Sequence, residues 1–336
     1  MSRNMTAWFS QMISAKTKKA LPILSFPGTQ LIGASVAKII SDSDLQSQCI
    51  QRVANRCDTA ASVSLMDLSV EAEAFGAGIR VPDDEVPTVI RPAVTDAASV
   101  QALAIPKVGD GRTGLYVESA RKAKALITDR PMLAGAIGPF SLSGRLMDMT
   151  EIMINCIDEP DLVHALLEKT TTFLIEYVAA FKKAGLDGFV MAEPAAGLLS
   201  PEINAEFSTP YVKRIIASAQ DNDFAAVYHN CGNTIPLLPS ILENGARAIH
   251  LGNAIKLADA LPLAPSDKVV MGNIDPAGQF RNGTPESISA ATTQLLQDLG
   301  PKHPNFVISS GCDIPPLAPW ANIDAFFAAV QKYYAT

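Results

Sequence analysis

The chain has 336 residues, a formal net charge of −7, a hydrophobic content of 48% and a charged content of only 18%. It has no stripe of Lys and Arg that would neutralise a phosphate backbone, which argues against nucleic-acid binding. No stretch approaches the ~18 continuous apolar residues of a membrane-spanning helix, and the N-terminus lacks the apolar run of a signal peptide. We therefore expect a cytoplasmic protein without a membrane partner. Its five cysteines do not form a disulfide framework and are available to a metal.

Short apolar runs recur along the chain and alternate with segments of helical periodicity. The runs are continuous rather than alternating, which is typical of buried parallel strands. The predicted strands are 22–26, 62–68, 131–139, 188–192, 224–230, 247–251, 269–272 and 306–310. The predicted helices are 3–15, which we expect to lie outside the core, and 43–61, 115–127, 142–155, 160–184, 201–206, 210–220, 236–243, 284–299 and 322–334.

Eight strand–helix repeats predict an α/β fold, a (β/α)₈ TIM barrel with an N-terminal helical extension. Residues 80–113 are rich in Pro, Asp and Gly and are expected to form a long excursion from it. We find no internal repeat and no linker, so we expect a single catalytic domain over 1–336. In such barrels the chemistry lies at the C-terminal ends of the strands.

Polar residues follow several of the predicted strands directly. They are Asp67, Glu193, His229, Cys231, Asn273, Asp275 and Cys312. His229 and Cys231 are two residues apart, so on a strand they point to the same side. If the ends of the fifth and eighth strands meet across the barrel mouth, Cys312 joins them. One His and two Cys suit a zinc ion with one open coordination position, as catalytic zinc sites have.

Other readings of these side chains remain open from the residues alone. His229 also fits a buried barrel histidine satisfied by hydrogen bonds. Glu193 fits a fourth metal ligand, a base, or a carboxylate that hydrogen-bonds the loops. Asp67 fits a partner of His229, a substrate contact or a loop cap. His250 is expected either to be a packing residue or to contact one of the site residues from behind. The remaining cysteines, Cys49, Cys57 and Cys156, are expected to be core residues.

Residues 109–114, Gly-Asp-Gly-Arg-Thr-Gly, match the glycine pattern of a dinucleotide-binding loop. That function requires a strand directly before the first glycine. Pro106-Lys107 interrupts the preceding segment. We therefore expect no nucleotide cofactor there.

The chain resembles the superfamily of uroporphyrinogen decarboxylases and methylcobamide:coenzyme M methyltransferases over nearly its whole length. The segments that carry the resemblance are 67–76, 199–202 with Phe207 and Pro210-Tyr211, 229–233, 272–276 and 309–315. In the methyltransferase branch the His-x-Cys pair and the later Cys bind zinc, which implies His229, Cys231 and Cys312 here. The decarboxylase branch carries an arginine-rich segment for substrate carboxylates, whereas residues 24–30 contain no arginine. A substrate with many carboxylates needs such cations.

The resemblance thus implies a zinc-dependent methyltransferase. Its methyl donor would be a methylcorrinoid (methylcobamide) on a separate carrier protein, and its acceptor a small-molecule thiol such as coenzyme M. We assign Glu193 and Asp67 to catalysis and Asn273, Asp275 and Gly311 to substrate binding. Two alternatives are a metal-free uroporphyrinogen decarboxylase-like enzyme and a non-catalytic barrel that binds a corrinoid carrier. The acceptor, which another thiol or a folate would also fit, and the upstream methyl donor are not encoded in a recognisable motif.

Overall fold

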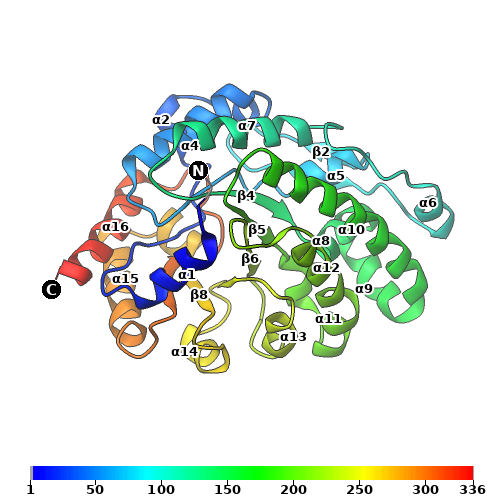
Figure 1. Ribbon diagram of the computed structural model, residues 1–336. Coiled ribbons are helices and arrows are strands. Elements are labelled where there is room, and N and C mark those ends of the chain that lie inside the picture. The colour runs from blue at the N-terminus through cyan, green and yellow to red at the C-terminus, as the bar shows by residue number, and fades with distance from the viewer. Residues whose placement is uncertain (1–2, 336) are drawn as a thin grey trace.

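The computed structural model describes residues 3–335 and has a curved, seven-stranded parallel sheet at its centre (Figure 1). The strands pair in the order β1-β4-β5-β6-β7-β8-β9. Their bounds are β1 Ser62–Val63, β4 Met132–Ile137, β5 Gly188–Ala192, β6 Ala225–Asn230, β7 Ala248–Leu251, β8 Val269–Ile274 and β9 Phe306–Ser310. Apart from β1, the strands match the predicted apolar runs within a few residues. The sheet is α/β and barrel-like, as the sequence predicts.

Residues 20–24 lie between the two outer strands, β9 and β1, although they form no regular strand. The Leu21 amide donates to the carbonyl of Ile308 (3.0 Å), and the Ala60 amide donates to the carbonyl of Ala20 (2.8 Å). The predicted strand 22–26 therefore occupies its expected place, but it pairs irregularly. Likewise, the predicted strand 62–68 is a regular strand only over Ser62–Val63.

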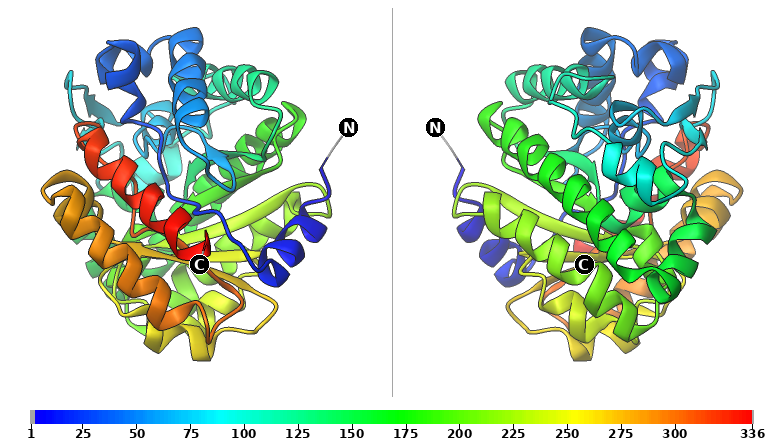
Figure 2. Two further views of the ribbon diagram at one scale, coloured as in Figure 1. Left: turned by 90° about the vertical axis from the view of Figure 1, so that its left-hand side faces the viewer. Right: turned by 90° about the vertical axis from the view of Figure 1, so that its right-hand side faces the viewer.

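Helices surround the sheet, and the C-terminal pair α15 and α16 lie side by side (Figure 2). The helices after α1 have the bounds α2 Gly28–Ile32, α3 Val36–Ile39, α4 Ser43–Arg56, α5 Val70–Ala74, α6 Ala97–Ala102, α7 Thr113–Leu126, α8 Pro139–Met147, α9 Met149–Asp158, α10 Pro160–Lys183, η1 Pro194–Leu198, α11 Pro201–Phe207, α12 Thr209–Ala219, α13 Leu238–Leu242, α14 Leu257–Ala260, η2 Leu261–Leu263, η3 Pro276–Arg281, α15 Pro285–Leu299 and α16 Trp320–Ala335. Among residues 3–335, no helix combines the length and apolarity needed to cross a bilayer.

The N-terminal helix α1 (Met5–Ser14) does not lie outside the core as predicted. Its Met5, Phe9 and Met12 are buried in a cluster with inward-facing strand residues such as Val227 and Met271. Burying a large apolar side chain is worth about 1.5–3 kcal/mol, so three such residues hold the helix against the end of the barrel. The prediction was wrong because these residues recur at positions that also fit a weakly amphipathic surface helix.

Two further departures lie around the barrel mouth. The predicted helix 142–155 is divided into α8 and α9 because Asp148 adopts a positive φ of 98° and caps α9, accepting from the Thr150 amide (2.8 Å). The segment after α5, in which the sequence predicts a long excursion, contains an antiparallel hairpin, β2 (Gly78–Arg80) and β3 (Thr88–Arg91). The hairpin residue Arg91 lines the cavity described below.

Candidate metal centre

The structure brings His229, Cys231 and Cys312 together at the C-terminal end of the sheet. One ligand atom from each lies within 4.8 Å of the other two, and Cys312 Sγ is 3.5 Å from His229 Nε2. His229 lies near the end of β6, Cys231 follows that strand, and Cys312 follows β9. Two strands separate β6 from β9, so the curvature of the sheet produces this convergence. Their role as metal ligands stays a prediction.

Two glycines allow the strand ends to approach. A Cβ at Gly252, just after β7, would lie 2.4 Å from the Cα of Cys231. A Cβ at Gly311 would lie 2.7 Å from Asn253 Oδ1 and 2.9 Å from the Asn253 amide nitrogen. Distances this short exclude any larger residue without a shift of the backbone. Gly311, assigned to substrate binding from the sequence, thus has a packing role that places Cys312.

The imidazole of His229 is oriented by a chain of buried polar groups. His229 Nδ1 is 2.7 Å from His250 Nδ1, and His250 Nε2 is 2.7 Å from Ser309 Oγ. Ser309 Oγ donates its only proton to the carbonyl of Leu21 (2.7 Å), so it accepts from the Nε2–H of His250. A neutral His250 then accepts at Nδ1 from the Nδ1–H of His229.

The consequence of this chain is a fixed tautomer. Burial, and next the neighbouring His229, lower the pKa of His250 well below its ordinary value, which keeps it neutral. His229 carries its proton on Nδ1, and its Nε2 lone pair faces Cys312. Metal-binding histidines are commonly held in this way by a partner on the other ring nitrogen. For His250 this is one of the two roles expected from the sequence, whereas Ser309 was given no role there.

The thiols of Cys231 and Cys312 are hydrogen-bonded to each other. The hydrogen bond from Cys312 is the largest cause of the lowered pKa of Cys231. The resulting thiolate, together with burial, raises the pKa of Cys312. Both cysteines are partly exposed, whereas Cys49, Cys57 and Cys156 are buried as expected. A nitrogen lone pair, a thiolate and a second thiol form a donor set that fits zinc.

Cys231 opens onto a cavity of about 500 Å³ at the barrel mouth. The walls come from the β2–β3 hairpin, α8 and the loops after β5 and β6. The lining residues are Val89, Ile90, Arg91, Pro92, Ser141, Gly144, Arg145, Asp148, Met149, Pro194, Ala195, Leu198, Cys231 and Gly232. A small substrate can therefore reach Cys231 from solvent through this cavity.

Glu193 follows β5, but its carboxylate caps the beginning of α8. Its oxygens accept from the amides of Phe140 (2.7 Å) and Ser141 (3.0 Å), and Ser208 Oγ donates to it at 3.3 Å. Glu193 is fully buried, and burial raises its pKa to about 7. Of the roles open from the sequence, hydrogen bonding is the one displayed by these contacts. Its assignment to catalysis stays a prediction.

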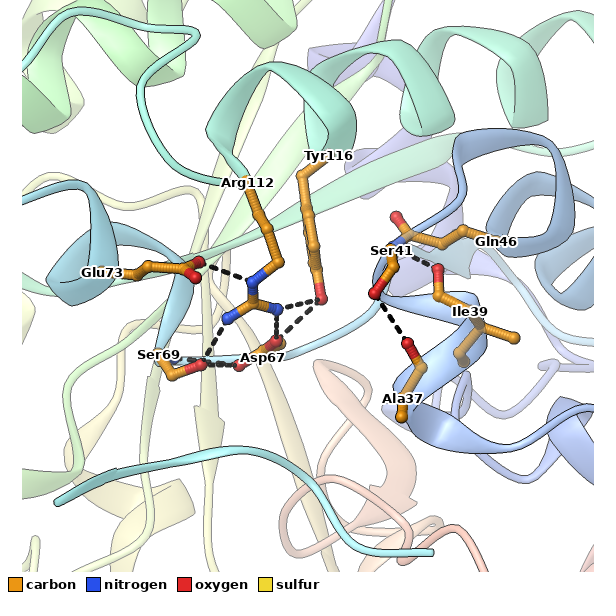
Figure 3. Close-up of polar contacts among 9 residues, drawn as sticks. All are labelled: Ala37, Ile39, Ser41, Gln46, Asp67, Ser69, Glu73, Arg112 and Tyr116. Carbon is orange, nitrogen blue, oxygen red and sulfur yellow. Dashed lines mark hydrogen bonds and ion pairs between the residues drawn. The ribbon is translucent and has the colours of Figure 1, made fainter. Parts of the chain in front are cut away.

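Asp67 belongs to a separate network with Ser69, Arg112 and Tyr116 (Figure 3). One carboxylate oxygen accepts from the amide (3.0 Å) and hydroxyl (2.6 Å) of Ser69. The other accepts from Arg112 Nη1 (2.5 Å) and Tyr116 Oη (2.8 Å). Arg112 Nε also donates to Glu73 Oε2 (2.6 Å). Asp67 makes no contact with His229, so of its open roles the local cap is the one seen.

Arg112 comes from the glycine pattern at 109–114. This segment is preceded by a loop rather than a strand and leads into α7. The glycine pattern therefore lacks the preceding strand that a dinucleotide-binding loop requires. The segment instead supplies the ion-pair partner of Asp67.

Asn273 and Asp275 hold loops next to the site. Asn273 Nδ2 donates to the carbonyls of Gly252 and Ile255, both at 2.9 Å. Asp275 Oδ1 accepts from the amides of Ala277 (2.9 Å) and Gly278 (2.8 Å). Their assignment to substrate binding stays a prediction.

A family model described as uroporphyrinogen decarboxylase (URO-D) matches residues 22–333 of the chain. The chain belongs to this family. The methylcobamide:CoM methyltransferase MtbA of Methanosarcina acetivorans is 28% identical over 271 residues, which cover 80% of this chain and 78% of that protein. A uroporphyrinogen decarboxylase of Coxiella burnetii is 29% identical over 289 residues, covering 81% and 77%.

A solved structure described as a methyltransferase from Methanosarcina mazei superposes with a TM-score of 0.86 at 21% identity, covering 98% of this chain and 99% of that one. This likeness confirms the predicted fold class. The superfamily recognised from the sequence is confirmed as well. The chain is thus an enzyme of the URO-D superfamily that has methyltransferases among its relatives.

Proposed function

We propose that this protein is a zinc-dependent methyltransferase that moves a methyl group from a methylcorrinoid on a carrier protein to a thiol such as coenzyme M. The observation that carries the proposal is the convergence of His229, Cys231 and Cys312 beside an open cavity. The similarity to methylcobamide:CoM methyltransferases supports the same reading.

His229 Nε2, Cys231 Sγ and Cys312 Sγ would hold the metal. Zinc, when bound, supplies a Lewis acid that favours the thiolate form of a bound thiol at neutral pH. The chain of His250 and Ser309 keeps the Nε2 lone pair of His229 directed at the site. The cavity beside Cys231 would admit the acceptor. The acceptor sulfur then bonds to the methyl carbon while the methyl–cobalt bond breaks, with both electrons remaining on cobalt.

One observation favours the alternative, decarboxylation of a tetrapyrrole with several carboxylates. Arg91, Arg145 and Arg281 line cavities at the mouth and form no side-chain hydrogen bond or ion pair with residues 3–335. However, a metal-free decarboxylase has no use for two adjacent thiols and an oriented histidine. The two functions differ in their requirement for zinc.

The direct test is methyl transfer from methylcobalamin to thiols, measured by the absorbance change of the corrinoid and by mass spectrometry of the methylated thiol. We expect activity in the zinc-loaded protein, loss on chelation, and recovery when zinc is restored. Cys231→Ser should abolish the activity, whereas Cys156→Ala, a change at a buried cysteine outside the site, should retain it. Chelator-resistant decarboxylation of a porphyrinogen, without methyl transfer, would replace the proposal with the alternative.

A further inference from the structure

We propose that Asn230 is a positioning residue for the candidate metal centre. Its side chain fixes the loop that carries Cys231, so that the Cys231 thiol faces the thiol of Cys312. The identity of the metal rests on the proposed function, whereas the placement of the loop rests only on the contacts of Asn230.

Asn230 is the last residue of β6 and lies between two candidate ligands in the sequence. Successive side chains of a strand point to opposite sides, so Asn230 faces away from the side shared by His229 and Cys231. The side chain is buried, with an exposed fraction of 0%. Asn230 therefore acts on the site through the backbone and not as a ligand.

The Asn230 side chain joins two loops by hydrogen bonds at both of its polar atoms. Its Nδ2 donates to the backbone carbonyl of Glu193, which follows β5, at 2.7 Å. Its Oδ1 accepts from the amide of Gly232 at 2.9 Å, a local turn typical of asparagine. Because β6 ends at Asn230, the regular ladder of the sheet does not extend to Cys231. The Asn230 side chain instead holds the chain where it leaves the strand.

Neighbouring glycines let the flanking loops pack directly against this turn. A Cβ at Gly197, in η1, would lie 2.4 Å from Asn230 Oδ1 and 2.7 Å from the Cα of Gly232. A Cβ at Gly232 would in turn lie 2.5 Å from the carbonyl oxygen of Gly197. On the other side, Gly252 approaches Cys231 as described above. Packing thus limits how far the loop can move, and the two bonds of Asn230 set its direction.

The position of the Cys231 thiol decides whether the donor set is complete. The ligand atoms of His229, Cys231 and Cys312 lie within 4.8 Å of one another. A metal site requires its ligands to be held within about 0.5 Å of their productive positions. His229 has its own partner in the ring of His250. Loss of the Asn230 bonds should therefore displace Cys231 and leave the histidine in place.

An amide suits this place because it donates to one backbone group and accepts from another. Leucine has a similar shape and neither function, so Asn230→Leu removes both bonds and leaves their backbone partners unpaired. The matched control is Asn244→Leu. Asn244 is also buried, and its Oδ1 accepts from the amide two residues on, that of Ala246, at 2.8 Å. It precedes β7 and so lies at the opposite end of the sheet from the candidate ligands.

The experiment titrates metal-free wild type, Asn230→Leu and Asn244→Leu with zinc in competition with a chromophoric chelator, and with cobalt(II), whose absorption spectrum reports bound thiolates. In Asn230→Leu we expect zinc affinity to fall about 10- to 100-fold, as on loss of a group that orients a ligand, and the sulfur-to-cobalt band to weaken. Asn244→Leu should match wild type in both, although thermal unfolding should show similar destabilisation of the two variants. Asn230→Asp, which keeps the acceptor for the Gly232 amide, should lie between wild type and Asn230→Leu.

Binding of phenylarsine oxide, which bridges two adjacent thiols, requires neither zinc nor turnover. Wild type and Asn244→Leu should bind it equally, and Asn230→Leu should bind it at least about tenfold more weakly. A wild type that takes up no zinc or methylates no thiol would overturn the proposed function, while selective loss of arsenical binding in Asn230→Leu would still support the positioning role.

The positioning role is overturned if folded Asn230→Leu retains wild-type zinc affinity, cobalt spectrum and arsenical binding. Equal losses in Asn244→Leu, or a wild type that does not bind the arsenical, would overturn it as well. If Asn230→Leu does not fold, the milder pair Asn230→Asp and Asn244→Asp decides by the same measurements, with a loss expected only in Asn230→Asp.

Discussion

Two polar clusters share the mouth of this barrel, and they differ in how completely their groups are satisfied. Around Asp67 both carboxylate oxygens have donors, and Arg112 is bonded on several sides. Around His229 and Cys231 a ring nitrogen lone pair and two thiols face one another with few other partners. The first cluster is satisfied by partners among residues 3–335, whereas the second is a donor set that fits a metal ion. This difference separates polar groups that hold the fold from those available for chemistry.

The largest expected loss of stability comes from removing Arg112, the cation of the Asp67 cluster. Arg112→Ala leaves the buried carboxylate of Asp67 without its cation, and such a change typically costs about 3–5 kcal/mol of unfolding free energy. Denaturant unfolding of the variant measures this loss. Arg121→Ala, which removes an exposed pair with Glu118, is the control and should cost less than about 1 kcal/mol. Equal losses in the two variants would show that the Asp67 cluster is not a structural element.

A second expected effect concerns the pH dependence of stability. Burial raises the pKa of both Glu193 and Glu71 to about 7 from the ordinary value of 4.5. Between these values the folded state retains protons that the unfolded state releases, so the free energy of unfolding should fall as pH rises from about 4.5 to 7. Each carboxyl contributes on the order of a few kcal/mol across this window.

The test of this pH effect is Glu193→Gln, which cannot release a proton. The variant should lose less stability than wild type between pH 5 and 8, with the remaining slope due to Glu71. Chemical unfolding at several pH values measures both slopes. An unchanged slope would contradict the raised pKa of Glu193.

A smaller effect is expected from the residue that orients the candidate metal ligand. His250→Phe keeps a buried ring but removes the nearer of two acceptors for the Nδ1–H of His229, the His250 ring nitrogen at 2.7 Å, and leaves the backbone carbonyl of residue 250 at 3.2 Å. Loss of such a partner usually weakens metal binding about 10- to 100-fold. Competition with a chromophoric zinc chelator measures the affinity. Wild-type affinity in a folded His250→Phe variant would show that the His250 ring does not orient His229.

The smallest effect is expected one step further along the same chain. Ser309→Ala removes the group that fixes the tautomer of His250 but leaves both imidazoles in contact. We expect zinc affinity to fall less than about tenfold, and less than in His250→Phe. The same chelator competition ranks the two variants. A larger loss in Ser309→Ala would reverse the proposed order of influence.

The sequence predicts most of the fold because buried parallel strands are continuous apolar runs. It predicts less well where neighbours decide the structure. Residues 22–26 occupy the predicted position, but only contacts with β9 and the segment before β1 show that their pairing is irregular. The amphipathic pattern of α1 identifies a helix, but it does not reveal that Met5 and Phe9 meet the inner residues of the sheet.

The same limit applies to the candidate site. The sequence identifies three residues of metal-binding type at strand ends, His229, Cys231 and Cys312. Only the curvature of the sheet brings their side chains together. The role of His250 depends on its pairing register opposite His229, which no local pattern encodes. The partner of Asp67 comes from 45 residues along the chain, and the unpaired state of Arg145 becomes visible only when all its neighbours are placed.

The most direct test of the central claim is zinc bound to the purified protein, quantified by elemental analysis and characterised by X-ray absorption, in wild type and Cys312→Ser. We predict about one zinc per chain in wild type, with two sulfur ligands near ~2.3 Å and a nitrogen ligand near ~2.0 Å. In Cys312→Ser we predict weakened binding and a single sulfur ligand. A wild-type protein that takes up no zinc on titration, or a variant that binds zinc unchanged, would contradict the account.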